Sequence, residues 1–411
     1  MLNVLINAYA VSPNWGSEQG MGWNWVVNLA KYCNVDVITE GEWRDEIEKA
    51  VSALPQRDNL TFHYLPVTDK VRRMCWNQGD WRFYYYYRKW QKRALDCARE
   101  IIADHQIDVI HQLNMVGFRE PGYLWKIKGI PFVWGPVGGM ELMPMEYLRG
   151  VSAKQRYFNI IKNRINKFQY THSSRVKAAI NRANVLISAV KGVQDVIKNV
   201  HHKESVLINE TGVKIDSSVV KKPCEKDAPL KIIWVGKFDF RKQLPLALRA
   251  VAALGKHDVE LHICGAGSEA VVEEMKKIAE AVGIADQCFW HGNVPNAEVK
   301  RMMADSDLML FTSIMEATST VVLEAISVGL PVVCFNACGF GPIVDDFAGI
   351  TVELSDPDKS VRDFADVLGR IYDDRTILDK ISQDILANRE SLTWDSKAVK
   401  TVELYNSIVR R

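Results

Sequence analysis

Residues 306–333 read SDLMLFTSIMEATSTVVLEAISVGLPVV, and this stretch decides the fold class. An apolar run, Leu308–Phe311, is followed by a polar loop, by a helical apolar pattern from about Thr318, and by a second apolar run, Val332–Phe335. Short strands that alternate with helices are typical of parallel sheets covered by helices on both faces. The stretch therefore predicts an α/β fold.

The same alternation continues through almost the whole chain and predicts two Rossmann-like, doubly wound parallel-sheet domains. Residues 213–230 contain two prolines and mixed charge, so we interpret them as a linker between domains 1–212 and 231–392. The other predicted strands are Leu2–Ala8, Val35–Thr39, Leu60–Leu65, Val109–His111, Phe132–Trp134, Val185–Ala189 and Val206–Asn209 in the first half, and Lys231–Val235, Val259–Cys264, Cys288–Trp290 and Ile350–Val352 in the second.

Composition is that of a globular protein in a reducing compartment. The chain has 411 residues, of which 47% are hydrophobic and 25% charged. Its eight cysteines form no CxxC pair, which favours free thiols over disulfides or zinc. We find no leader peptide and no apolar run near the roughly 18 residues that span a bilayer, so we expect a cytoplasmic protein. Lys and Arg exceed Asp and Glu by 28 to 20 in residues 1–212, and this balance reverses to 24 against 30 afterwards.

Two glutamates flank the predicted helix start in the opening stretch. Free backbone N–H groups and hydroxyls near the start of a helix attract phosphate. Glu324, inside the helix, could accept hydrogen bonds from a ribose diol, and Glu316, before it, could contact sugar hydroxyls. An ordinary capped helix with a solvated glutamate explains the same residues. The residues at the helix start are Thr318, Ser319 and Thr320.

A basic loop follows another predicted strand, in IIWVGKFDFRKQLPLALRA at 232–250. After Gly236 come Lys237, Arg241 and Lys242. Cations at the carboxyl end of a strand can neutralise a diphosphate and stabilise it as it leaves. A solvated basic loop is the alternative.

Together these stretches resemble the retaining glycosyltransferases of family 4, which have the GT-B fold. The similarity rests on four segments in the family's order: VGKFDFRK, LHICGAGSE, FWHGNVPNAEV and MEATSTVVLEAISVGLPVV. The resemblance implies two Rossmann-like domains that face a central cleft. It also implies a closing helix, residues 393–411, that crosses back onto the N-terminal domain.

The resemblance also implies roles for individual residues. Lys237 and Lys242 match the basic residues that hold the donor diphosphate, Glu316 matches the glutamate at the donor sugar, and Glu324 the one at the ribose. Lysine at 237 departs from the family's arginine, and Gln243 from its glycine. The other residues implied at the donor are Gly236, Arg241, Gly265, Gly267, Asn293, Val294 and Thr318, with the amides of Ser319 and Thr320.

The first half resembles the family less closely. Gly16 and Ser17 match paired glycines that approach the donor, although a glycine-bearing turn after a first strand also fits a dinucleotide-binding loop. His111 matches the first of two histidines, of which the second is Leu113 here, so a catalytic role competes with a structural one. The acceptor pocket is expected around Gly138, Gly139 and Glu141.

The resemblance implies a retaining, metal-independent transfer of sugar from a UDP- or GDP-sugar, with no cofactor. The acceptor would be a lipid-linked or growing cell-surface glycan, as in polysaccharide or lipopolysaccharide assembly. A catalytically silent protein of this fold that binds sugar nucleotide, and a nucleotide-sugar epimerase, are the alternatives.

Two segments combine basic and aromatic residues, 70–99 and 151–200. Such a combination suits the headgroups of an anionic membrane, which would place the enzyme at the inner membrane face. The aromatic residues could instead belong to the core. We expect no nucleic-acid partner, since no RNA-binding motif accompanies the basic residues.

Overall fold

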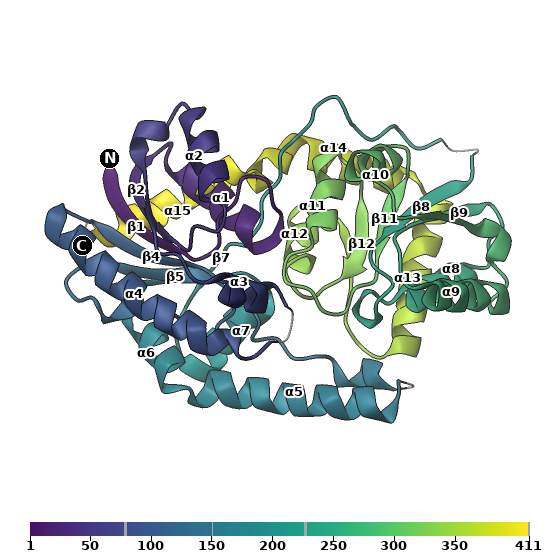
Figure 1. The fold of residues 1–411 in the computed structure, drawn as a ribbon. Coiled ribbons are helices and arrows are strands. Elements are labelled where there is room, and N and C mark those ends of the chain that lie inside the picture. The colour runs from purple at the N-terminus through teal and green to yellow at the C-terminus, as the bar shows by residue number, and fades with distance from the viewer. Residues whose placement is uncertain (78–79, 150, 226–227, 410–411) are drawn as a thin grey trace. The chain divides into compact units, whose positions relative to one another are not determined.

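The computed structural model describes residues 1–77, 80–149, 151–225 and 228–409, which form two compact units (Figure 1). The first unit comprises Met1–Glu141, Arg164–Thr211 and Trp394–Arg411. The second comprises Leu142–Asn163 and Gly212–Thr393. Each unit has its own sheet, and every strand pairing recorded in the two sheets is parallel. The predicted α/β class with two parallel sheets is confirmed.

The sheet of the first unit has the strand order β3-β2-β1-β4-β5-β6-β7. Its strands are β1 (Leu2–Ala8), β2 (Cys33–Thr39), β3 (Leu60–Tyr64), β4 (Val109–Asn114), β5 (Phe132–Val137), β6 (Val185–Ser188) and β7 (Val206–Leu207). The helices of the first half are α1 (Ser17–Leu29), α2 (Arg44–Ser52), α3 (Asp69–Trp76), α4 (Phe83–Asp104), α5 (Ala153–His172), α6 (Ser174–Arg182) and α7 (Lys191–His201).

Strand β1 explains why this sheet is covered on both faces. Successive side chains of a strand point to opposite faces. Val4 and Ile6 belong to one apolar cluster together with Trp25 of α1. Leu5, between them, belongs to another cluster with Trp90 of α4. A strand that is apolar on both faces is buried on both, as is usual in parallel sheets.

The sheet of the second unit has the order β10-β9-β8-β11-β12-β13. Its strands are β8 (Leu230–Val235), β9 (Val259–Cys264), β10 (Cys288–Gly292), β11 (Leu308–Phe311), β12 (Val332–Phe335) and β13 (Ile350–Val352). Its helices are α8 (Leu244–Leu254), α9 (Glu269–Ala281), α10 (Asn296–Ala304), α11 (Thr320–Ser327), α12 (Gly341–Asp346), α13 (Pro357–Asp373) and α14 (Thr376–Asn388). Within the described ranges, no helix is both long and apolar enough to cross a membrane.

The boundary between the units differs from the one drawn from sequence. Residues 142–163, which we expected in the N-terminal domain, group with the second unit, as do residues 213–230. Met143, Tyr147 and Leu148 belong to the apolar core of that unit, and the Tyr147 hydroxyl lies 2.7 Å from the Ser360 hydroxyl. Because these three apolar side chains are buried in the core of the second unit, residues 142–163 group with that unit, although the segments before and after them belong to the first.

The last helix, α15 (Trp394–Val409), belongs to the first unit and packs against α1. Its Tyr405 hydroxyl lies 2.5 Å from Nδ1 of the fully buried His111, whose Nε2 lies 2.6 Å from the Gly135 carbonyl oxygen. Burial lowers the pKa of His111 to about 4, against the opposing effect of the Gly135 hydrogen bond. In the neutral ring Nε2–H donates to Gly135, so Nδ1 accepts from Tyr405.

Replacing Tyr405 by Phe should lower Tm by several degrees. The variant leaves the buried acceptor Nδ1 of His111 without a donor, which costs about 1–3 kcal/mol. Differential scanning calorimetry measures the change. Tyr157→Phe, which removes a hydroxyl from an exposed residue, is the control and should melt like the wild type. Equal Tm values for both variants would contradict the role of this hydrogen bond.

Candidate functional site

A cavity of about 700 Å³ lies in the second unit, at the carboxyl ends of four adjacent strands, β10, β9, β8 and β11. This edge is where open parallel sheets bind their ligands. The cavity is lined by Val235, Gly236, Lys237, Asp239, Arg241, Lys242, Cys264, Gly265, Ala266, Gly267, Asn293, Val294, Val299, Glu316 and Val321.

Three cations line this cavity, and their loop is held in place by Asp239. The Asp239 carboxylate accepts from the backbone N–H groups of Arg241 and Lys242, and it pairs with the Arg241 guanidinium at 2.9 Å. Burial alone would raise the pKa of Asp239, but the hydrogen bond and charge of Arg241 hold it below its ordinary value. Lys237 is exposed and forms no ion pair with the rest of the described chain.

Lys242 and Glu316 form an ion pair inside the cavity wall. Lys242 Nζ lies 2.7 Å from Glu316 Oε1, and the two side chains are only 11% and 18% exposed. Lys242 Nζ also lies 4.9 Å above the centre of the Phe311 ring. The pair therefore joins a cation from the loop after β8 to a carboxylate from the loop after β11, in a setting with little water.

Hydrogen bonds to backbone carbonyl oxygens hold these two loops together. The Ile314 N–H donates to the Arg241 carbonyl oxygen at 2.9 Å. The Thr312 hydroxyl lies 2.8 Å from the carbonyl oxygen of Lys242, and the Ser313 hydroxyl 3.2 Å from that of Arg241. The distance between Lys242 and Glu316 is thus set by their backbones as well as by their charges.

The turn after β9 requires glycine at one position. A Cβ at Gly265 would lie 1.8 Å from the Gly236 carbonyl oxygen, which no side chain could avoid. At Gly267 a Cβ would lie 3.1 Å from Cβ of Phe238. The two predicted glycines therefore let the loops after β8 and β9 approach each other and form one wall of the cavity.

Glu324 lies beside the cavity rather than in its lining. It accepts a hydrogen bond of 2.8 Å from Asn296 Nδ2, and burial raises its pKa while the Asn296 bond opposes the rise. The helix that carries it begins at Thr320, with Ser319 as its N-cap. Thr318 and Ser319 are buried and, like Thr320, are not part of the cavity lining.

The predicted residues of the first unit lie at the carboxyl edge of its own sheet. Gly16 is the N-cap of α1, and Ser17 has a φ of +54°, the conformation for which the family uses glycine. Gly139 also has a positive φ, +81°. Glu141 packs against Gly192 near the start of α7, and burial raises its pKa to about 7.

His111 does not reach a cavity. It is fully buried, and both ring nitrogens are engaged by Tyr405 and Gly135. We therefore leave it out of the proposed site.

Glu18, which we did not single out from sequence, follows the Gly16–Ser17 turn. Its Oε1 accepts from the Val116 N–H at 3.1 Å, whereas its buried Oε2 has no hydrogen-bond partner. Burial raises its pKa to about 7, against the effect of the Val116 bond. Glu18 could have been singled out from sequence by its position after the first strand, because residues that follow a strand of a parallel sheet lie at the edge that binds ligands.

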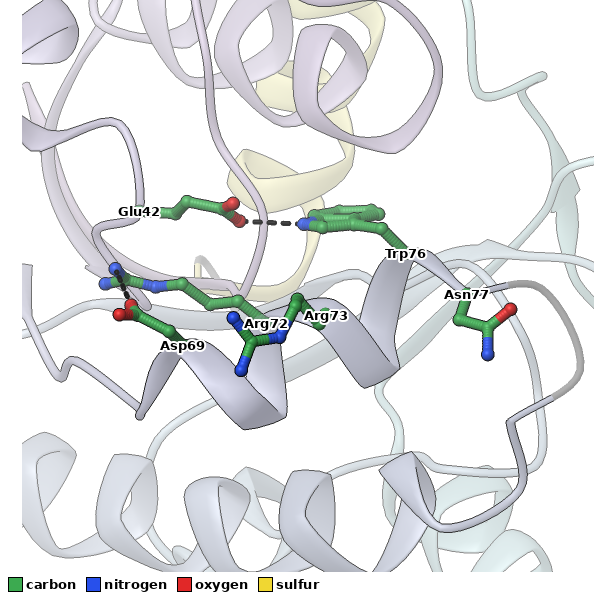
Figure 2. Close-up of a pocket in the computed structure, with 6 residues that line it drawn as sticks. All are labelled: Glu42, Asp69, Arg72, Arg73, Trp76 and Asn77. Atoms are coloured by element: carbon green, nitrogen blue, oxygen red, sulfur yellow. Dashed lines mark hydrogen bonds and ion pairs between the residues drawn. The ribbon is translucent and has the colours of Figure 1, made fainter.

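A second cavity, of about 490 Å³, lies in the first unit beyond the carboxyl ends of β2 and β3. Trp76 Nε1 donates to Glu42 Oε2 at 2.8 Å, while the Arg73 side chain has no partner among the residues drawn (Figure 2). The Trp76 ring lies 5.6 Å from that of Trp43, which lies 6.2 Å from exposed Trp15. The lining residues are Glu42, Asp69, Arg72, Arg73, Trp76 and Asn77.

Residues 218–384, which include the whole first cavity, match the family model for glycosyl transferases group 1. This segment is a glycosyl transferases group 1 domain. Membership of family 4 within that group stays a prediction. Within the described part of the chain, no three His, Cys, Asp or Glu side chains are grouped to hold a metal ion.

Curated relatives match over less than half of the chain. A D-inositol 3-phosphate glycosyltransferase of Arthrobacter sp. is 28% identical over 182 residues, 43% of this chain and 42% of its own length. A lipopolysaccharide 1,6-galactosyltransferase of Salmonella typhimurium is 29% identical over 170 residues, 41% of this chain and 45% of its own. The chain thus spans less than half of either relative.

Solved structures include some that are similar over almost the whole chain. Anabaena HepE in complex with UDP has a TM-score of 0.61 at 14% identity, and the match covers 99% of this chain and 100% of that one. This likeness concerns the fold alone. It confirms the GT-B type of fold that the glycosyltransferase segments predict.

Glu18→Gln should make the protein more stable at high pH. The folded state raises the pKa of Glu18 from 4.5 to about 7, so stability falls as pH rises through this window and the carboxyl ionises. Glutamine keeps the Val116 contact without charge. We expect Tm of the variant to exceed that of the wild type by a few degrees at pH 8 and by almost nothing at pH 4.5.

Thermal melts of both proteins between pH 4.5 and 8 measure this difference. Glu100→Gln, an exposed glutamate on α4, is the control and should follow the wild type. A difference between wild type and Glu18→Gln that stays constant with pH would contradict the buried-carboxyl interpretation.

Proposed function

We propose that this protein is a glycosyltransferase whose group 1 domain binds a nucleotide sugar in the 700 Å³ cavity. The observation that carries the proposal is the meeting of Lys237, Arg241 and Lys242 with Glu316 in one cavity wall. Cations favour a dianionic diphosphate, most strongly at Lys242, whose side chain is only 11% exposed, and a neighbouring carboxylate can accept from sugar hydroxyls.

The ion pair suggests how the cavity responds to a donor. Lys242 neutralises Glu316 at 2.7 Å. A diphosphate that reaches Lys242 competes with this carboxylate and leaves Glu316 available to hydroxyl groups of the sugar. Lys242 then stabilises charge that grows on the leaving diphosphate, so its attraction is stronger in the transition state than for the bound donor.

The finer features of the reaction belong to the same proposal. Transfer would proceed with retention of configuration. It would need no metal, since lysine and arginine side chains would contact the diphosphate where a metal ion would otherwise neutralise it. Glu324 with Asn296 would contact the ribose. UDP is the first nucleotide to test, because the similar HepE is described in complex with it. GDP is the alternative.

The second cavity, which the predicted acceptor residues Gly138, Gly139 and Glu141 do not line, is our candidate for the acceptor. Sugar rings present C–H groups that pack on the faces of aromatic rings. Trp76 lines the cavity, and an aromatic row continues from it through Trp43 to Trp15, with ring centres 5.6 and 6.2 Å apart. Arg73 could contact a phosphate or carboxylate of the acceptor. A lipid-linked or growing glycan at the inner membrane face fits these groups, and the Salmonella relative is named for action on lipopolysaccharide.

Lys242→Ala and Glu316→Ala should each lower kcat for sugar transfer by about 10²–10³, the usual cost of removing one preorganised charge. Because the two side chains are paired, the double variant should lose less than the product of the single losses. The rates are measured as the formation of labelled product from radiolabelled UDP- and GDP-sugars, with and without EDTA.

Lys276→Ala, an exposed lysine on α9, is the control and should keep the wild-type rate. Near wild-type rates in both cavity variants would refute the assignment. Calorimetric binding of UDP-sugar by a wild type that never turns it over would instead identify a silent binding protein.

Trp76→Ala should raise KM for the acceptor about tenfold while leaving the Kd for UDP unchanged, because the aromatic row would contact only the acceptor. Trp76→Phe should retain most of the acceptor affinity, since the ring face remains. Steady-state kinetics against acceptor concentration, beside UDP titration, make the measurement. Trp81→Ala, a highly exposed tryptophan outside the cavity, is the control. Equal KM values for all variants would exclude this acceptor cavity.

A further inference from the structure

Helix α5 (Ala153–His172) is basic along its whole length. It contains Lys154, Arg156, Lys162, Arg164 and Lys167, and no Asp or Glu. Lys177 follows on α6, whereas Arg175 beside it is paired with Glu120 at 2.7 Å. Within α5 no acidic side chain compensates for five cations.

The inner face of α5 is mostly polar, unlike that of an ordinary surface helix. Asn159 and Asn166 are buried. Asn163 both donates to and accepts from the backbone of Met143. Asn166 donates to the carbonyl oxygens of Gly139 and Glu141. These hydrogen bonds hold this face together with one buried aromatic residue, Tyr170, which packs against Phe118.

The outer face of α5 carries the apolar side chains. Tyr157, Phe158 and Phe168 are 67%, 64% and 65% exposed, and Ile161 and Ile165 are 41% and 51% exposed. At 3.6 residues per turn these five positions lie within about 100° of one another around the helix axis. They form one stripe, opposite the asparagines, which is not covered by any part of the described chain.

We propose that this stripe docks on the surface of an anionic lipid bilayer. An interfacial helix places aromatic and aliphatic side chains at the boundary between headgroups and acyl chains, and lysine and arginine beside anionic headgroups. Lys154 lies within the angular range of the stripe, with Lys162 and Arg164 on its two sides. A second copy of the helix would bring five cations against five, so the charge favours lipid.

The segment 70–99 has a similar composition but a different structure. Its Phe83, Tyr87 and Trp90 are buried and pack around Tyr9. Only Tyr84, Tyr85 and Trp81 are markedly exposed among its large apolar residues within the described chain. We therefore assign docking to α5, and this assignment does not depend on the proposed function.

Co-sedimentation of the full chain with vesicles tests this assignment. We expect binding to phosphatidylcholine vesicles that contain 30% phosphatidylglycerol and none to phosphatidylcholine alone. The double variant F158S/F168S should bind at least tenfold more weakly, and K154Q/K162Q/K167Q about a hundredfold more weakly. Y84S/Y85S, two exposed aromatics on α4, is the matched control and should bind like the wild type.

Tm and sedimentation velocity of each variant separate the possible outcomes. Unchanged Tm values show that lost binding is not lost folding, as expected for exposed positions. Absence of wild-type binding to anionic vesicles, or equal loss in Y84S/Y85S, would overturn the proposal. A dimer that F158S/F168S converts to a monomer, with vesicle binding intact, would assign the stripe to a second copy instead.

Discussion

The ion pair between Lys242 and Glu316 is the interaction on which the 700 Å³ cavity depends. Removing a carboxylate and an ammonium from water costs several kcal/mol each, and their mutual attraction repays this only in good geometry. The pair at 2.7 Å meets that condition, because Thr312, Ser313 and Ile314 fix the two loops through the carbonyl oxygens of residues 241 and 242. A ligand that replaces one partner must supply an equal charge. Under the proposed function, this requirement favours a diphosphate over a neutral sugar.

The architecture of parallel sheets explains why both cavities lie where they do. Loops from neighbouring strands meet only at the carboxyl edge, so groups distant in sequence, such as Lys237 and Asn293, line one cavity. In the first unit the same rule brings Trp43, after β2, beside Trp76, after β3. The strands supply rigidity, and the loops supply the chemistry.

Much of this could be predicted from sequence, because the decisive signals are local. The strand Leu308–Phe311 and the cavity residues Lys237, Lys242 and Glu316 follow from short apolar runs and motif spacing. The grouping of residues 142–163 and the unpartnered Glu18 oxygen depend on contacts between distant segments. Helices α4 and α5 each combine five basic residues with several aromatic ones, although only α4 also carries acidic residues. Composition does not indicate which face of a helix packs against the rest of the protein. Helix α4 buries aromatic side chains, whereas α5 buries asparagines and exposes most of its aromatic side chains.

Gln243 and Ser17 occupy positions where the resemblance to family 4 implies glycine, and both have a positive φ, +52° and +54°. Such a conformation costs a residue with a side chain about 1–2 kcal/mol, and Gln243 recovers part of it through a hydrogen bond of 2.7 Å from its Nε2 to the Phe240 carbonyl oxygen. A side chain also restricts the unfolded chain, so less entropy is lost when the loop forms. The glycines of such a signature thus indicate a required backbone conformation rather than a required chemical group. A search for distant relatives that requires glycine at these positions will miss proteins in which another residue adopts the same backbone conformation.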